Sequence, residues 1–310
     1  YVMVVVTVLL FTELKHTFTE LAQRMKNDEM ITLAKFLAIS GIILPMLPNE
    51  NLIPDINLTP YTVWLATVVV SGISYLSYLL RRYVFHESGI LVSGIIGGLY
   101  SSTATISVLA RKSRKAPAQE APEYAAAMLL AVSMMFLRFL ILIGIFSKAI
   151  LAEIYPYLLI MSFVTAGVAW YLHRKRKPIP VTGEEAEEED SSNPLEFKVA
   201  LIFAVLFVIF TIVTHYTLIY TGTGGLNVLS FIAGLSDITP FILNLLQGSG
   251  VAVVVVTACC MQAIVSNIAV NMCYALFFAG GKSSLRRWVL RGFGGVIAVN
   301  VCMLLFFYLL

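Results

Sequence analysis

Two ionisable side chains stand inside long apolar stretches of this sequence. Arg138 lies within AVSMMFLRFLILIGIF, and Asp237 lies within SFIAGLSDITPFILNLLQ. Charged side chains in such stretches are costly to place in a membrane, so they face the protein interior or a water-filled cavity and mark functional sites. We therefore expect Asp237 and Arg138 to pair with each other or to line one cavity. A purely structural ion pair is the alternative.

Glycines and hydroxyl-bearing residues gather around both apolar stretches. The segment GIIGGLYSSTATISVLAR precedes Arg138, and a shorter version of this pattern surrounds Asp237. Glycine permits non-helical angles, and open backbone within hydrocarbon must face protein or water. Freed carbonyls, hydroxyls and helix ends could then coordinate an ion; the alternative is close helix packing by small residues. The candidate pathway residues are Gly97, Gly98, Ser101, Ser102, Thr103, Thr105, Arg138, Gly234, Ser236, Asp237, Thr239, Asn267 and Asn271.

Three of these candidates carry amide or carboxylate oxygens that suit a cation. Asn267 and Asn271 share one helical face because they are four residues apart. They could supply oxygens to a site or bond between helices, and the sequence leaves both roles open. Asp237 is the best candidate for a metal ligand, since a carboxylate is a hard oxygen ligand. The sequence does not identify the metal.

The elements that must position these residues are membrane helices. The chain is 59% hydrophobic and 13% charged, whereas soluble domains are near a quarter charged. A helix needs about 20 apolar residues to cross the hydrocarbon layer. We expect an all-α polytopic bundle with helices near 1–11, 31–48, 60–82, 122–146, 154–173, 195–221, 250–280 and 284–310.

Two further apolar segments, 88–110 and 225–247, are predicted to be re-entrant or broken helices. Lys and Arg near helix ends favour the cytoplasmic side. If 88–110 crossed fully, Arg81 and Arg82 would lie opposite the basic cluster 111–115. If both segments enter and return on one side, every basic cluster is cytoplasmic.

The same two segments form the centre of an internal repeat. Without gaps, Gly98 aligns with Gly234, Ser101 with Asp237, and Thr103 with Thr239. The following helices also align and place Arg138 opposite Asn271. Because the first segment would enter from the cytoplasm and the second from outside, the halves are expected to be inverted, as in many transporters.

The repeat suggests how the chain is organised. Residues 1–30 are expected to hold the end of an upstream membrane helix and a polar connector, and 31–173 the first membrane repeat. Residues 174–193 pass from basic to acidic low-complexity sequence, which predicts a flexible linker. The second repeat would occupy 194–310.

The paired signatures also resemble a known family. GGLYSSTATISVLAR and AGLSDITP are similar to the two motifs of the membrane domain of unknown function found in MgtC/SapB-family bacterial proteins. The resemblance covers residues 12–310 and implies a multi-pass protein of the prokaryotic inner membrane. The family pattern often has an acidic residue at the position of Thr239 and a lysine at that of Asn271, and this sequence departs from it at both.

Two functions fit these observations. The first is a channel or secondary transporter for a small inorganic ion, a cation in preference to an anion, because Asp237 and clustered hydroxyls are hard ligands. The second is a non-transporting membrane regulator or scaffold whose partners bind the cytoplasmic face. No GxSxG, HExxH, Walker A or Rossmann motif is present, so we expect no enzyme activity and no cofactor. The expected partners are the lipid bilayer, a small ion and, as an open option, further copies of the chain, but no nucleic acid.

Overall fold

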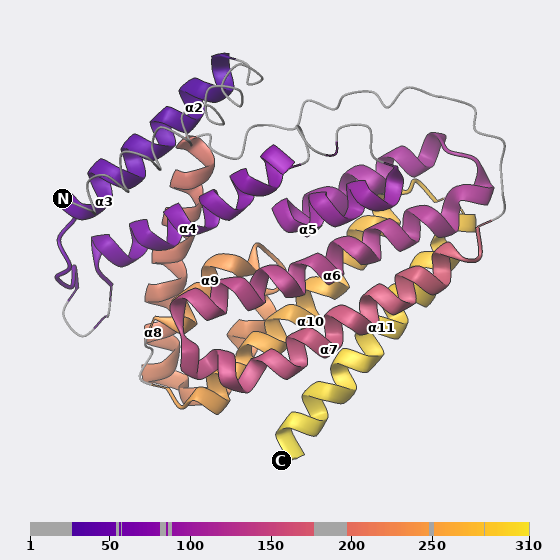
Figure 1. The fold of residues 1–310 in the computed structure, drawn as a ribbon. Helices are drawn as coiled ribbons and strands as arrows, with labels where there is room; N and C mark the ends of the chain where they lie inside the picture. The colour runs from indigo at the N-terminus through magenta and orange to yellow at the C-terminus, as the bar shows by residue number, and fades with distance from the viewer. Residues whose placement is uncertain are drawn as a thin grey trace, which may run out of the picture.

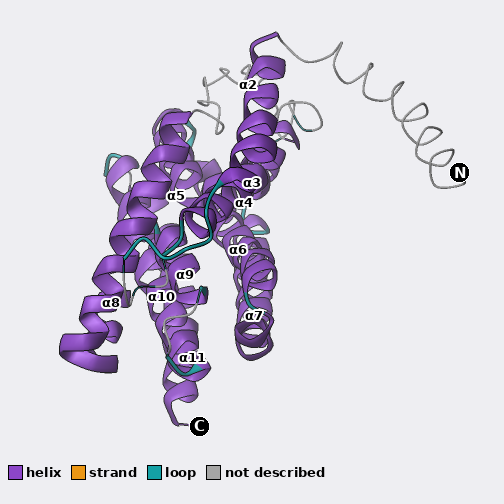
Figure 2. Ribbon diagram, turned by 90° about the vertical axis from the view of Figure 1, so that its left-hand side faces the viewer, coloured by secondary structure: helices purple, strands orange, loops and turns teal. Residues whose placement is uncertain are grey.

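The protein is a bundle of α-helices. A computed structural model describes residues 27–53, 56, 58–80, 85, 89–176, 197–247, 251–281 and 283–309. Within this part of the chain no β-strand forms, and Ile53 and Ile56 make an isolated bridge. Seven of the described helices are long and apolar enough to cross a membrane. Figure 2 shows the helices joined by short loops, with α8 along one side of the bundle. The protein is therefore the polytopic all-α protein that the composition predicts.

The helices follow one another with short connections, except where the sequence predicts a linker. The described elements are α2 (Asn27–Ala38), a π-helix (Ile39–Ile43), α3 (Leu44–Met46), α4 (Pro60–Leu79), α5 (Ile90–Lys115), a 3₁₀ turn (Ala118–Glu120), α6 (Ala121–Phe146), α7 (Lys148–His173), α8 (Phe197–Ala233), α9 (Ile238–Leu246), α10 (Val253–Phe278) and α11 (Ser283–Leu309). Many of the most buried residues lie on α6 and α10, and α6, α7 and α11 run alongside one another (Figure 1).

Helix α5 is a hairpin of two helical arms. Its backbone leaves helical geometry at Ser101, with φ −159° and ψ 110°. A Cβ placed on Gly97 would lie 2.5 Å from the hydroxyl of Thr105, although eight residues of straight helix span about 12 Å. The two arms therefore fold against each other.

Contacts with α6 give the direction of each arm. Gly94 packs on the backbone of Ala127, and Gly98 packs on that of Ala131, so the first arm runs parallel to α6. The second arm ends at Lys115, and only residues 116–120 separate it from α6. Ile90 and Lys115 therefore lie at the same end of the bundle. This is the re-entrant geometry predicted for 88–110.

A second hairpin occupies the equivalent place in the second half. Helix α8 breaks at Gly222, where φ is +64°. The arm after this break runs parallel to α10, because Cys259 donates to Asn227 and Ser266 donates to the Phe231 carbonyl. The arm ends at Ala233, and α9 then begins at Ile238. Residues 223–246 therefore form the second interrupted segment, as the sequence predicts for 225–247.

The equivalent helices of the two halves run in opposite directions. Tyr157 on α7 donates to Asn300 on α11 at 2.6 Å, and Gly292 packs near Leu172. Higher residue numbers on α7 thus meet lower numbers on α11, so the two helices are antiparallel. Since α7 and α11 follow the aligned helices α6 and α10, the two halves form an inverted repeat.

The described basic clusters meet at one end of the bundle. Arg114 donates to the carbonyl of Phe278, and the Arg111 guanidinium lies over the ring of Phe278, 4.6 Å from its centre. At the same end, Arg176 forms an ion pair of 3.0 Å with Glu123 at the start of α6. The charge pattern thus predicts correctly that these clusters share a side.

Some predicted boundaries differ from the structure. The helix expected at 31–48 runs without interruption from Asn27 to Met46 and contains a π-helical turn at Ile39–Ile43. Helix α7 begins at Lys148 rather than at 154, because the Ser147 hydroxyl accepts a hydrogen bond from the Ile150 amide and caps it. The predictions for residues 1–26, Arg81, Arg82, Lys282 and most of the linker lie outside the described residues.

Candidate functional site

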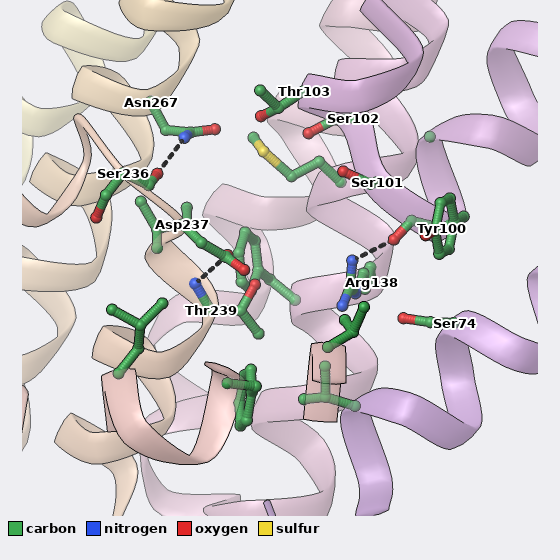
Figure 3. A pocket seen from close by; sticks show the side chains of 18 of the residues that line it. Ser74, Tyr100, Ser101, Ser102, Thr103, Arg138, Ser236, Asp237, Thr239 and Asn267 are labelled. Carbon is green, nitrogen blue, oxygen red and sulfur yellow. Dashed lines mark hydrogen bonds between the residues drawn. The ribbon is translucent and has the colours of Figure 1, made fainter. Parts of the chain in front are cut away.

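A cavity of about 390 Å³ lies where the two hairpin tips meet. Elements from both halves line it: α4, the tip of α5 and α6 from the first half, and α8, the tip before α9, the start of α9 and α10 from the second. The arm Ile90–Tyr100 rises about 16 Å at 1.5 Å per residue. This is about half of the 30 Å hydrocarbon layer. The cavity therefore lies near mid-depth, and Figure 3 shows the polar side chains that point into it.

Asp237 is the acidic side chain of this cavity. One carboxylate oxygen accepts a hydrogen bond of 3.0 Å from the Thr239 amide, which makes Asp237 the N-cap of α9. The residue is exposed, and its carboxylate points into the space between the two halves (Figure 3). The second oxygen is therefore open to a solute.

Ser101 occupies the position in the first hairpin that Asp237 occupies in the second. Its hydroxyl accepts a hydrogen bond of 3.3 Å from the Ala104 amide and caps the second arm of α5. The ungapped alignment places these two caps opposite each other, and the structure gives them the same local role. The repeat therefore carries a carboxylate on one side of the cavity and a hydroxyl on the other.

Arg138 lies across the cavity from Asp237 (Figure 3). Its Nη1 donates to the carbonyl oxygen of Tyr100 at 2.7 Å, the last residue before the break at Ser101. The Arg138 Nε is buried without a hydrogen-bond partner. The guanidinium thus stabilises the carbonyl end of the first arm. Arg138 and Asp237 line the same cavity without a direct ion pair.

Asn267 bonds backbone carbonyls at the tip of the second hairpin, as Arg138 bonds a backbone carbonyl at the tip of the first. Its amide nitrogen lies 3.3 Å from the carbonyl oxygens of both Gly234 and Ser236. Its own oxygen accepts from the fully buried Asn271 at 3.0 Å. The sequence leaves open whether Asn267 supplies an oxygen to a site or bonds between helices. The structure supports the second role, because Asn267 bonds the carbonyls at the interruption between α8 and α9.

The structure brings most of the predicted pathway residues to the cavity wall and packs the others behind it. The lining residues are Gly98, Ser101, Ser102, Thr103, Arg138, Ser236, Asp237, Thr239 and Asn267. Gly97 and Thr105 instead hold the two arms of α5 together, and Gly234 packs against Ala263 and Ser266 of α10. Asn271 lies behind Asn267.

Some lining residues are not evident from the motifs. Ser71 and Ser74 reach the cavity from α4, and the Tyr100 carbonyl is the acceptor for Arg138. The serines at 71, 74 and 77 recur every three residues in an apolar segment, which is a signal for a polar helix face. Nothing in the residue type of Tyr100 indicates that its backbone oxygen is used.

The donors of the site are oxygens. The described part of the chain contains no cluster of three or more His, Cys, Asp or Glu side chains that could enclose a metal ion. The free groups are a carboxylate oxygen and hydroxyls from both halves. Carboxylate and hydroxyl oxygens are hard donors of the kind that bind cations.

Comparisons with known proteins agree with the family resemblance in part. Residues 68–279 match the family model described as "Domain of unknown function (DUF4010)". An "Uncharacterized protein" of Aquifex aeolicus (strain VF5) is 27% identical over 205 residues, which is 62% of this chain and 84% of the relative. No solved structure matches. The matched range contains both hairpins and every cavity-lining residue.

Proposed function

We propose that this protein, which belongs to the DUF4010 family, is a membrane channel or secondary transporter for a small inorganic ion. A cation is favoured over an anion. The observation that carries the proposal is the meeting of two inverted helical hairpins at a polar cavity near mid-depth, with Asp237 open to it. Inverted repeats with interrupted helices commonly place their transport site at such a point.

The exposure of Asp237 supports transport over a scaffold role. A charge at the centre of a bilayer costs at least about 2.5–3.5 kcal/mol unless it faces water or a partner. Asp237 has no ion pair in the described part of the chain, so its carboxylate requires water in the cavity. A regulator or scaffold would be served better by a dry, close-packed interface at the two Gly-Leu motifs.

The hydrogen bonding of Arg138 supports a cation. The guanidinium is bonded to the Tyr100 carbonyl, so its charge already has an oxygen partner. The free carboxylate oxygen of Asp237 and the hydroxyls of Ser102 and Thr103 are hard donors for a cation. An anion that bound the remaining N–H groups of the guanidinium would have to lie in the same cavity as the Asp237 carboxylate, which repels it.

Location and assembly follow as parts of the proposal. The basic end of the bundle and the 174–193 linker would face the cytoplasm by the positive-inside rule, in a prokaryotic inner membrane. The wider relationship to MgtC/SapB proteins stays a prediction from the motifs. Further copies of the chain could assemble in the bilayer, and we expect no enzymatic role.

Ion flux into liposomes that contain the purified protein tests the proposal. Asparagine is as good an N-cap as aspartate, so Asp237→Asn removes the charge while keeping the cap of α9. We expect this variant to fold normally and to lose at least tenfold in cation flux. The matched control is Glu153→Gln, which changes an exposed acid on α7 outside the cavity lining and should leave flux unchanged.

Two outcomes would contradict the proposal. The first is flux through Asp237→Asn equal to that of the unaltered protein. The second is loss of folding in Asp237→Asn with rescue by Arg138→Met, because that pattern identifies a structural charge pair whose removal strands a buried cation.

A further inference from the structure

The cavity lining carries one side-chain charge of each sign. Among the described residues that line it, Asp237 is the acidic side chain and Arg138 the basic one. Both face the same space from opposite sides (Figure 3). The empty site therefore has a formal side-chain charge of zero.

The helix ends around the cavity do not change this balance. The two arms that begin there are capped by acceptors, Ser101 and Asp237. The two arms that end there have carbonyls bonded by donors, Arg138 and Asn267. Because two helix N-termini and two helix C-termini meet at the cavity, their partial charges of opposite sign offset one another, and the helix ends leave little net potential for an arriving ion.

The charge of the ion then determines the solvation cost of placing it in the cavity. A monovalent cation beside Asp237 leaves the site with a net charge of +1, and a divalent cation leaves +2. The solvation cost of a net charge in a low-dielectric site grows with the square of that charge, so it is about four times larger for the divalent ion. Protein sites for Ca²⁺ use several oxygen ligands, often with more than one carboxylate, and Mg²⁺ also gives up its water reluctantly.

We infer that the site selects monovalent over divalent cations, and that Arg138 is the residue that determines this selectivity. The inference rests on the proposed function and adds the ion class to it. Arg138 acts as a fixed positive charge that is present whether or not a solute is bound. Its bond to the Tyr100 carbonyl holds that charge on the cavity wall, opposite the carboxylate that receives the mobile ion.

The first test measures selectivity in liposomes with Na⁺, K⁺, Mg²⁺ and Ca²⁺ for the unaltered protein, Arg138→Gln and Arg138→Lys. We expect the unaltered protein to carry Na⁺ or K⁺ at least tenfold faster than either divalent ion. Arg138→Gln removes the charge and keeps a polar side chain on the cavity wall, so divalent flux should rise at least tenfold relative to Na⁺. Arg138→Lys keeps the charge and should keep the selectivity. Arg287→Gln removes an exposed cation outside the cavity and should leave the ratio unchanged.

A second measurement does not depend on the folding of an Arg138 variant. Thermal unfolding of the unaltered protein is followed in NaCl, KCl, MgCl₂ and choline chloride at matched ionic strength. A ligand that binds only the folded state raises the melting temperature. We expect Na⁺ or K⁺ to raise it above the choline value, Mg²⁺ not to raise it, and Asp237→Asn to abolish the difference.

The outcomes separate this inference from the proposed function. Divalent flux equal to monovalent flux in the unaltered protein, or an unchanged ratio in a folded Arg138→Gln variant, overturns the inference and leaves transport standing. Flux of anions alone overturns both the cation preference and the inference. Absence of flux for every ion, with no stabilisation by any salt over choline, overturns the proposed function itself.

Discussion

Gly98 packs so closely on α6 that its replacement by alanine should destabilise the protein. A Cβ at this position would lie 2.5 Å from the Cα of Ala131 and 2.6 Å from its carbonyl oxygen. Ordinary van der Waals contact begins at 3.4 Å, so the hairpin and α6 must separate by nearly an ångström. Both atoms belong to the backbone, and no side chain can rotate to make room.

The expected cost follows from overpacking. Extra methylenes in a well-packed core cost about 1–3 kcal/mol, which at about 2–4 °C per kcal/mol lowers the melting temperature of Gly98→Ala by about 2–12 °C. Gly295→Ala is the matched control. Gly295 lies inside α11 with nothing within 4 Å of the added carbon, so alanine there should be neutral or stabilise by up to about 1 kcal/mol.

Thermal unfolding of both variants in detergent, followed by tryptophan fluorescence, measures the difference. The reasoning is refuted if Gly98→Ala melts at or above the temperature of Gly295→Ala. Gly234→Ala provides an internal check, because its Cβ would lie 2.6 Å from the carbonyl of Ala263. The equivalent glycine of the inverted repeat should therefore show a similar fall.

Two further predictions concern topology and buried polar contacts. For the topology test, single cysteines are placed at Gly89, Ala116 and Lys148 in a variant without native cysteines. A membrane-impermeant reagent should label the first two from the same side and the third from the other side. Labelling of Gly89 and Ala116 from opposite sides would contradict the α5 hairpin. Tyr157→Phe removes the donor to a buried asparagine on α11 and should lower stability by about 0.6 kcal/mol, up to about 1.7. Tyr155→Phe, at an exposed tyrosine two residues away, should have no effect, and equal melting of the two variants would show that the buried bond contributes nothing.

Much of the fold could be predicted because its signals are local. Hydropathy places α6, α10 and α11 within a few residues of their observed ends. Glycine and hydroxyl clusters mark both interruptions, because backbone breaks in a membrane need small residues and alternative hydrogen-bond partners. The basic clusters predict the re-entrant path of α5, because a full crossing by residues 88–110 would place Arg81 and Arg82 on the opposite side from the cluster 111–115. The start of α7 was missed because Ser147 acts as a cap, which hydropathy does not report.

The sequence by itself determined that the chain is a membrane bundle of two related halves, and that Asp237, Arg138 and the hydroxyl clusters belong to one site. These conclusions need only composition, periodicity and internal similarity. Only the tertiary structure decided which partners the side chains take. Arg138 bonds the Tyr100 carbonyl rather than Asp237, and Asn267 rather than Asn271 bonds the second break. Such choices depend on the distance and rotation between helices far apart in the chain, and a difference of one helical turn decides which side chain reaches the cavity.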